Sequence, residues 1–229
     1  TMTHSSNTDT LFDGLLDPVS NDNPVGQSIR YGPTHRAIKE SRREDDSTLP
    51  LGIWEHDLKK ADWAKTVTLC RQGLIKESKD LQIACWLIEA GIHEFGIDAA
   101  APGLTFINTL CSTYWDSMYP EDDNEEDSPR FSPIIWLDDR LSTLILRTTL
   151  FEGQDENGTF PWSFSDYELA RRQSSKPRTE PASSEETATR YNIDAFNETL
   201  NNEPVSHLAQ VTATLDSIDA QATLLEEEL

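Results

Sequence analysis

The chain has 229 residues and a formal net charge of −22, with 41 acidic and 19 basic side chains. Nucleic acid and anionic membrane surfaces are not expected partners, because binding to either needs clustered Lys and Arg rather than a field that repels anions. Six Trp and eight Phe residues supply much of the 36% hydrophobic content, which is enough to bury a helical core.

The cysteines and the apolar runs favour a reducing compartment and no membrane insertion. Cys70, Cys85 and Cys111 lie inside apolar helical patterns and are odd in number, so we expect small buried hydrophobes rather than disulfides or metal ligands. The longest apolar runs, such as 83–88, are far shorter than the ~20 residues that span a bilayer. The first residues lack the basic-then-apolar pattern of a signal peptide.

The first sixty residues contain little predicted regular structure. Residues 1–13 are predicted to be a disordered tail, and prolines and glycines keep the next segment irregular. A short polar helix is predicted over 34–45. The loop that follows, over 47–60, carries Trp54, which is expected to dock that loop onto the core.

Four stretches show helical periodicity, over about 63–74, 81–95, 102–118 and 134–151. The second is apolar on most of its circumference, which predicts a helix in the middle of a bundle. Ser78 is its expected N-cap, with Asp80 in the first turn. Because the connections are short, the chain is predicted to be all-α, an antiparallel helical bundle with long N-terminal loops.

The rest of the chain departs from this pattern. Alternating aromatics and the turn signal Asn157-Gly158 predict a short extended segment or hairpin near 155–165. The composition of 171–189 is typical of a mobile linker. Residues 190–229 are predicted to begin a second helical region of a longer protein, with a separate C-terminal helix. Its narrow apolar seam suits helix pairing and consists of Leu208, Val211, Leu215, Ile218 and Leu225.

Catalytic sequence motifs are missing. No Gly-x-Ser-x-Gly elbow, His-Glu-x-x-His pair, phosphate-binding Gly loop or Cys-x-x-Cys pair occurs. The acidic loop 121–127 lacks the glycine and the distal glutamate of an EF-hand, so a solvated loop is favoured over a calcium site. Lys79-Asp80 fits either an active pair with shifted pKa values or a structural role at a helix start, and the structural role is favoured. We expect no catalysis, metal or cofactor.

The string Ser78–Leu87, SKDLQIACWL, resembles the signature of the ImpA-type N-terminal domain of the TssA family, which belongs to the bacterial type VI secretion system. Further elements of that domain occur in the right order on both sides of the string, so the resemblance covers about residues 14–170. The residues that match its motifs are expected to be mainly structural. They are Pro18, Gly26, Trp54, Trp63, Lys79, Asp80, Leu81, Trp86, Trp115, Pro120 and Trp136.

The resemblance implies an assembly role in the bacterial cytoplasm. A TssA-like chain is expected to act without catalysis, as an N-terminal protein-interaction arm that docks to baseplate, membrane-complex or sheath–tube components and associates with copies of itself. Candidate partner-binding residues are Glu121, Asp122, Asp123, Trp162 and Phe164. Two other classes stay open: a metal-dependent hydrolytic enzyme that uses the acidic loop, and an acidic decoy that mimics nucleic acid.

Overall fold

A computed structural model describes residue 8 and residues 10–45, 58–121, 129–155, 158–174 and 192–228. The chain forms two compact units, residues 1–140 with 218–229 and residues 141–217. Helices α6 (Phe131–Arg147) and α10 (Val205–Glu228) each contribute to both units. The domain boundaries at residues 170 and 190 that composition predicts both fall inside the second unit.

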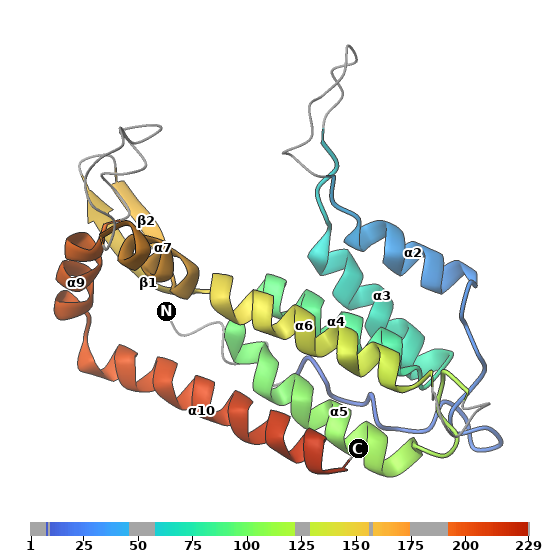
Figure 1. The fold of residues 1–229 in the computed structure, drawn as a ribbon. Coiled ribbons are helices and arrows are strands. Elements are labelled where there is room, and N and C mark those ends of the chain that lie inside the picture. Colours follow the sequence, from blue (N-terminus) through green and yellow to red (C-terminus); the bar gives the residue numbers. More distant parts are fainter. Residues whose placement is uncertain are drawn as a thin grey trace. The chain divides into compact units, whose positions relative to one another are not determined.

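The first unit is helical, as the periodicity predicts (Figure 1). Besides parts of α6 and α10, its helices are α2 (Pro33–Arg42), α3 (Trp63–Lys76), α4 (Leu81–Phe95), the 3-10 helix η1 (Ile97–Ala99) and α5 (Ala100–Tyr114). Helix α3 begins after Asp62, whose carboxylate accepts a hydrogen bond from the Lys65 amide at 3.0 Å. This cap satisfies one of the amides that a helix start leaves without an intrahelical partner.

Helix α4 is the centre of the first unit's core. Eleven of its fifteen residues are buried, and α3 and α5 both pack against it. The buried side chains confirm the prediction that this helix lies in the middle of a bundle. Cys70, Cys85 and Cys111 are buried, also as predicted. Burial raises the pKa of the Cys70 and Cys85 thiols well above the ordinary value, because it disfavours the thiolate.

The described N-terminal residues lie on the bundle. Leu11 and Leu15 are buried, and the Phe12 ring stacks on Phe106 of α5 with 5.4 Å between centroids. The Arg71 guanidinium of α3 donates hydrogen bonds to the carbonyls of residues 10, 11 and 13. Residues 10–13 are therefore anchored, whereas a disordered tail is predicted over 1–13. Local composition does not reveal that Leu11 and Leu15 reach the core, or that Arg71, far along the chain, binds these carbonyls.

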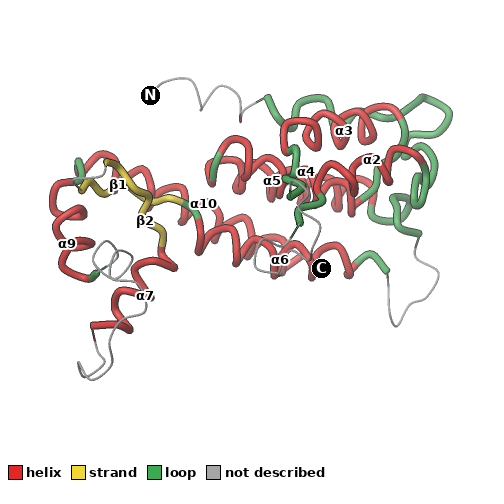
Figure 2. The backbone as a smooth tube through the Cα atoms, turned by 90° about the horizontal axis from the view of Figure 1, so that it is seen from above, coloured by secondary structure: helices red, strands yellow, loops and turns green. Residues whose placement is uncertain are grey.

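The second unit is built around a β-hairpin (Figure 2). Its strands β1 (Thr149–Asp155) and β2 (Gly158–Ser163) pair antiparallel, and α7 (Phe164–Ser174) and α9 (Ile193–Asn202) contact them. A small aromatic core holds these elements together. Its members are Phe151, Phe160, Trp162, Ala170 and Phe196.

This hairpin confirms the extended segment predicted near 155–165, and it also corrects the end of the preceding helix. Helix α6 stops at Arg147 rather than near Phe151, because residues 149–155 pair with β2 and Phe151 enters the aromatic core. The chain is thus mainly helical with one two-stranded sheet. Residues 171–174 of the predicted linker continue α7, and 175–189 lie outside the described residues.

The C-terminal part of α10 belongs to the first unit. Ile218 and Leu225 of the predicted seam are buried, and the Asn108 amide of α5 donates to the Gln221 carbonyl at 3.1 Å. This end of the C-terminal helix therefore packs on α5. Leu215, in the second unit, remains 37% exposed, so pairing of a second copy along the rest of the seam remains a prediction.

We predict that Gly153→Ala destabilises the second unit by about 1–3 kcal/mol. A Cβ at this position would lie 2.6 Å from Phe160 Cζ and 2.7 Å from Trp162 Nε1, so the hairpin would have to move off its own aromatic core. Thermal unfolding followed by near-ultraviolet circular dichroism measures the effect. Glu152→Ala, at the exposed neighbouring position, is the control, and equal midpoints for the two variants would contradict the prediction.

Candidate functional site

The Lys79-Asp80 pair joins the start of α4 to segments that are distant in sequence. Lys79 is fully buried, and its Nζ donates to the carbonyls of Leu15 and Leu74, each at 2.7 Å. Burial lowers the Lys79 pKa to about 8, against the opposing attraction of Asp17. The ammonium thus holds backbone acceptors, as the favoured structural interpretation expects.

Asp80, and not Ser78, is the N-cap of α4. Its Oδ1 accepts a hydrogen bond from the Ile83 amide at 3.1 Å. Ser78 instead pairs by a backbone bridge with Gly26, because the helix begins at Leu81, too late for a cap at residue 78. Burial raises the Asp80 pKa to about 6, although hydrogen bonds from backbone amides partly oppose this.

Gly26 and Pro120 complete this backbone junction. Gly26 has φ of +72°, and a Cβ there would lie 2.0 Å from the Glu77 carbonyl oxygen, so only glycine fits. The Leu81 amide donates to the Tyr119 carbonyl at 2.8 Å, and Arg130 Nε donates to the Pro120 carbonyl at 3.0 Å. Four motif residues, Gly26, Lys79, Asp80 and Pro120, therefore meet in one structural junction.

A different charged residue, Glu89 of α4, organises the side of the bundle that carries α2 and α6. Its side chain is 2% exposed. Glu89 Oε2 accepts hydrogen bonds from Arg42 Nε at 2.7 Å and Nη2 at 2.6 Å, and Oε1 accepts one from Arg140 Nε at 2.5 Å. Charge-assisted bonds to both oxygens compensate the desolvation of the carboxylate. Sequence analysis missed Glu89, although it is the sole charged residue between Leu81 and Ile92.

Two motif tryptophans lie against the guanidinium of Arg42. Arg42 Cζ lies 4.7 Å from the ring centroid of Trp86 and 5.1 Å from that of Trp136. Rings at this distance attract a cation through their negative faces. The side chain is thereby fixed by one carboxylate and two indoles.

A concave surface of about 370 Å³ opens beside this arrangement. We call it the arginine–tryptophan cleft, and its lining residues are Lys39, Arg42, Arg43, Glu44, Trp63, Glu89, Trp136 and Arg140. Four basic and two acidic residues give it a formal charge of +2, in contrast to the net charge of −22 of the chain. Trp63 is fixed by stacking on His93 of α4, with 4.0 Å between ring centroids and 5° between planes.

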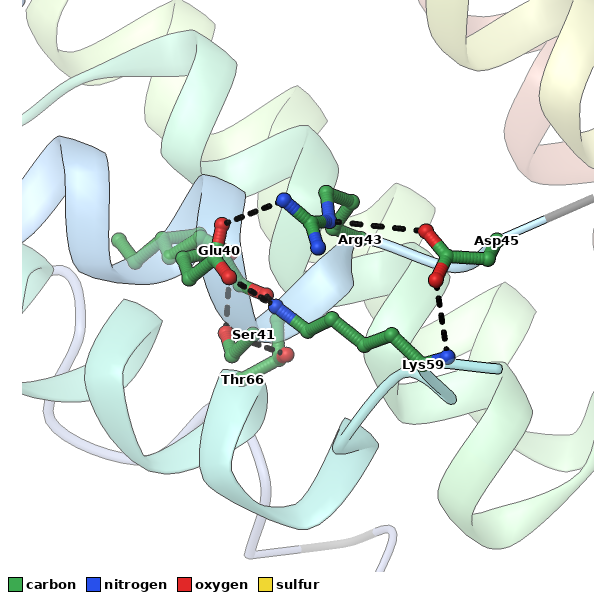
Figure 3. A network of polar contacts seen from close by, with 7 residues as sticks. Glu40, Ser41, Arg43, Asp45, Lys59 and Thr66 are labelled. Carbon is green, nitrogen blue, oxygen red and sulfur yellow. Dashed lines mark hydrogen bonds and ion pairs between the residues drawn. The ribbon is translucent and has the colours of Figure 1, made fainter. Parts of the chain in front are cut away.

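A polar network joins the cleft residue Arg43 to side chains outside the cleft (Figure 3). Arg43 lies between Glu40 at 3.7 Å and Asp45 at 3.9 Å. Lys59 Nζ pairs with Glu40, and its backbone amide donates to Asp45 Oδ2 at 2.9 Å. Ser41 and Thr66 share a buried hydroxyl hydrogen bond of 2.8 Å between α2 and α3. The network therefore ties the end of α2 to the segment that leads into α3.

The remaining predicted site residues lie in other places. Trp162 is fully buried in the aromatic core of the second unit, where it supports the hairpin rather than presenting a surface to a partner, whereas Phe164 is 43% exposed. Glu121 is exposed, and Trp54, Asp122 and Asp123 lie outside the described residues.

The other motif residues are scattered. Pro18 is exposed, and Trp115 lies 5.8 Å from Phe131 between ring centroids. In the described part of the chain, no three His, Cys, Asp or Glu side chains are placed to hold a metal ion. No helix in that part is both long and apolar enough to cross a membrane.

We predict that Asp80→Asn removes the part of the pH dependence of the free energy of unfolding that comes from titration of Asp80. The folded-state pKa of about 6 lies above the ordinary value of 3.8, so the contribution of Asp80 is present below about pH 4 and is lost as pH rises through 6. Asparagine keeps a cap oxygen but cannot ionise. Relative to wild type, its free energy of unfolding should rise by about 2 kcal/mol between pH 4 and pH 7. Urea unfolding over this pH range, with Asp62→Asn as control, measures it; parallel curves for wild type and Asp80→Asn would refute it.

We predict that Glu89→Gln lowers the free energy of unfolding by about 3 kcal/mol, because it leaves two arginines against a neutral amide that can satisfy them only in part. Urea unfolding followed by far-ultraviolet circular dichroism measures the loss. Glu94→Gln, at an exposed position of the same helix, is the matched control. Equal losses in the two variants would show that Glu89 does not stabilise the bundle as described.

Comparisons with known proteins agree with this fold. A family model described as "ImpA, N-terminal, type VI secretion system" matches residues 16–139. The type VI secretion system component TssA1 of Pseudomonas aeruginosa is 28% identical over 120 residues, which are 50% of this chain and 33% of that protein. The chain thus spans about a third of the length of that relative.

A solved structure shows the same fold. It is the N-terminal domain, including the conserved ImpA N-terminal region, of the TssA component of the type VI secretion system from Burkholderia cenocepacia. The alignment has a TM-score of 0.78 at 24% identity and covers 95% of this chain and 81% of that one. Since the family model alone matches more than half of the chain, the chain belongs to the TssA family of the type VI secretion system, through its ImpA-type N-terminal region.

Proposed function

We propose that this chain is a non-enzymatic protein-interaction arm in the assembly of a type VI secretion system. It works in the bacterial cytoplasm and docks to baseplate, membrane-complex or sheath components. The observation that carries this proposal is the arginine–tryptophan cleft, an open surface whose side chains are held in place before any partner arrives.

The preorganisation of this surface supports a binding role. Arg42 and Arg140 are fixed by Glu89, and Trp63 by His93, so a partner need not order these side chains on binding. Binding surfaces that are already ordered lose less conformational entropy, which favours affinity. Arg and Trp are also the side chains that are enriched where protein interfaces are strongest.

Self-association would strengthen such an arm. If copies of the chain are joined, the binding of one arm raises the effective concentration of the next at neighbouring sites. The exposed part of the seam, at Leu215, is one surface for this pairing.

The test is direct binding to separately purified baseplate, membrane-complex and sheath components of the same secretion system. We expect saturable binding to at least one component, measured by biolayer interferometry with the chain immobilised. An unrelated helical protein of equal net charge controls for attraction by charge alone. Binding to none of these components, or equal binding by the control protein, would contradict the proposed function.

A further inference from the structure

The lining of the arginine–tryptophan cleft is positively charged, although the chain as a whole is negatively charged. Its lining carries a formal +2 in a protein of −22. The acidic side chains next to the lining, Glu40 and Asp45, are paired with Arg43, and Glu40 also with Lys59. At physiological ionic strength charges are screened over about 8 Å, so a ligand seated in the cleft interacts with the basic lining more strongly than with acidic residues elsewhere on the chain. The cleft therefore favours negatively charged ligands.

The basic side chains of the cleft are available to such a ligand in different degrees. Arg42 binds Glu89 through Nε and Nη2, which leaves the Nη1 edge of the guanidinium directed away from that carboxylate. Lys39 is exposed and forms no ion pair with any described residue. Arg43 pairs only at long distance with side chains that are themselves exposed or partly exposed, and such pairs contribute little.

The aromatic walls show that the ligand is more than a small anion. Trp63 and Trp136 line the cleft beside the cations, and an inorganic anion would leave their cleft-facing apolar surface uncovered. A peptide with carboxylates next to apolar side chains uses both features, since carboxylates pair with guanidinium groups and apolar side chains cover the indole faces. A nucleic acid also combines charge and flat rings, but its phosphates continue along the strand beyond the cleft, where the acidic surface of the chain repels them.

We propose that the arginine–tryptophan cleft binds an acidic peptide segment of a partner protein, in which Asp or Glu residues alternate with apolar ones. This inference rests on the proposed function and names the chemistry of the partner segment that the arm receives.

The experiment compares two charge reversals on one helix. Lys39 lines the cleft and Arg36 does not, and both are exposed residues of α2, so Lys39→Glu and Arg36→Glu change the net charge equally and differ in place. The probe is a short fluorescein-labelled peptide in which Asp and Glu alternate with Leu and Phe. Its affinity is measured by fluorescence polarisation at physiological salt, and thermal unfolding confirms that both variants fold.

Wild type should bind this peptide and not its Asn/Gln counterpart. Lys39→Glu should weaken binding about tenfold and Arg36→Glu less than about twofold, because charge effects are largest for groups in contact. Equal weakening by both variants would overturn the cleft as the site. Competition by inorganic phosphate as effective as that by the unlabelled peptide would overturn the peptide as the ligand, and so would no binding by wild type.

A second measurement separates this inference from the proposed function. If Lys39→Glu still binds the secretion component as well as wild type does, the arm docks by another surface. This result would overturn the cleft as the docking site, while the proposed function would stand. If no component binds wild type but the acidic peptide does, the cleft is supported as a peptide site and the proposed function fails.

Discussion

One buried carboxylate organises the first unit. Glu89 lies in the middle of α4, and the other buried residues of this helix are apolar. An unpaired charge there would be strongly destabilising. Arg42 of α2 and Arg140 of α6 prevent this by hydrogen bonding to both of its oxygens. Helix α2 packs mainly on α3, so the directional bonds from Arg42 and Arg140 to one carboxylate help to define where α2 and α6 lie along α4.

The unit uses buried charge in two ways. At the start of α4, Lys79 and Asp80 bond to backbone groups and connect the N-terminal segment, the end of α3 and the turn at Tyr119. In the middle of the same helix, Glu89 bonds to arginines whose side chains extend to the surface. The motif residues at the start of α4 thus hold the chain together, and Glu89 lies about two and a half turns further along the same helix.

The sequence was sufficient for the local elements and insufficient for the site. Periodicity predicted the helices of the first unit, and the Asn157-Gly158 signal predicted the hairpin, because both depend on neighbours along the chain. Glu89 lies inside a predicted helix, but its role depends on Arg42 of α2 and Arg140 of α6. The sequence pattern of each helix does not show which residues of different helices meet. Trp162 is among the candidate partner-binding residues, but the structure buries it against Phe196, which follows more than thirty residues later and which the local pattern does not connect to it.

The shared carboxylate also divides the residues of the cleft by how freely they can vary in evolution. Changes at Arg42 or Arg140 disturb the bundle itself, so selection for folding would preserve them whatever the cleft binds. Lys39 has no such structural role, since it forms no ion pair with any described residue, and Arg43 makes only exposed pairs that contribute little to stability. Related chains can therefore acquire different specificities by drift at the edge of the cleft while its base stays constant, and recognition can diverge without loss of the scaffold.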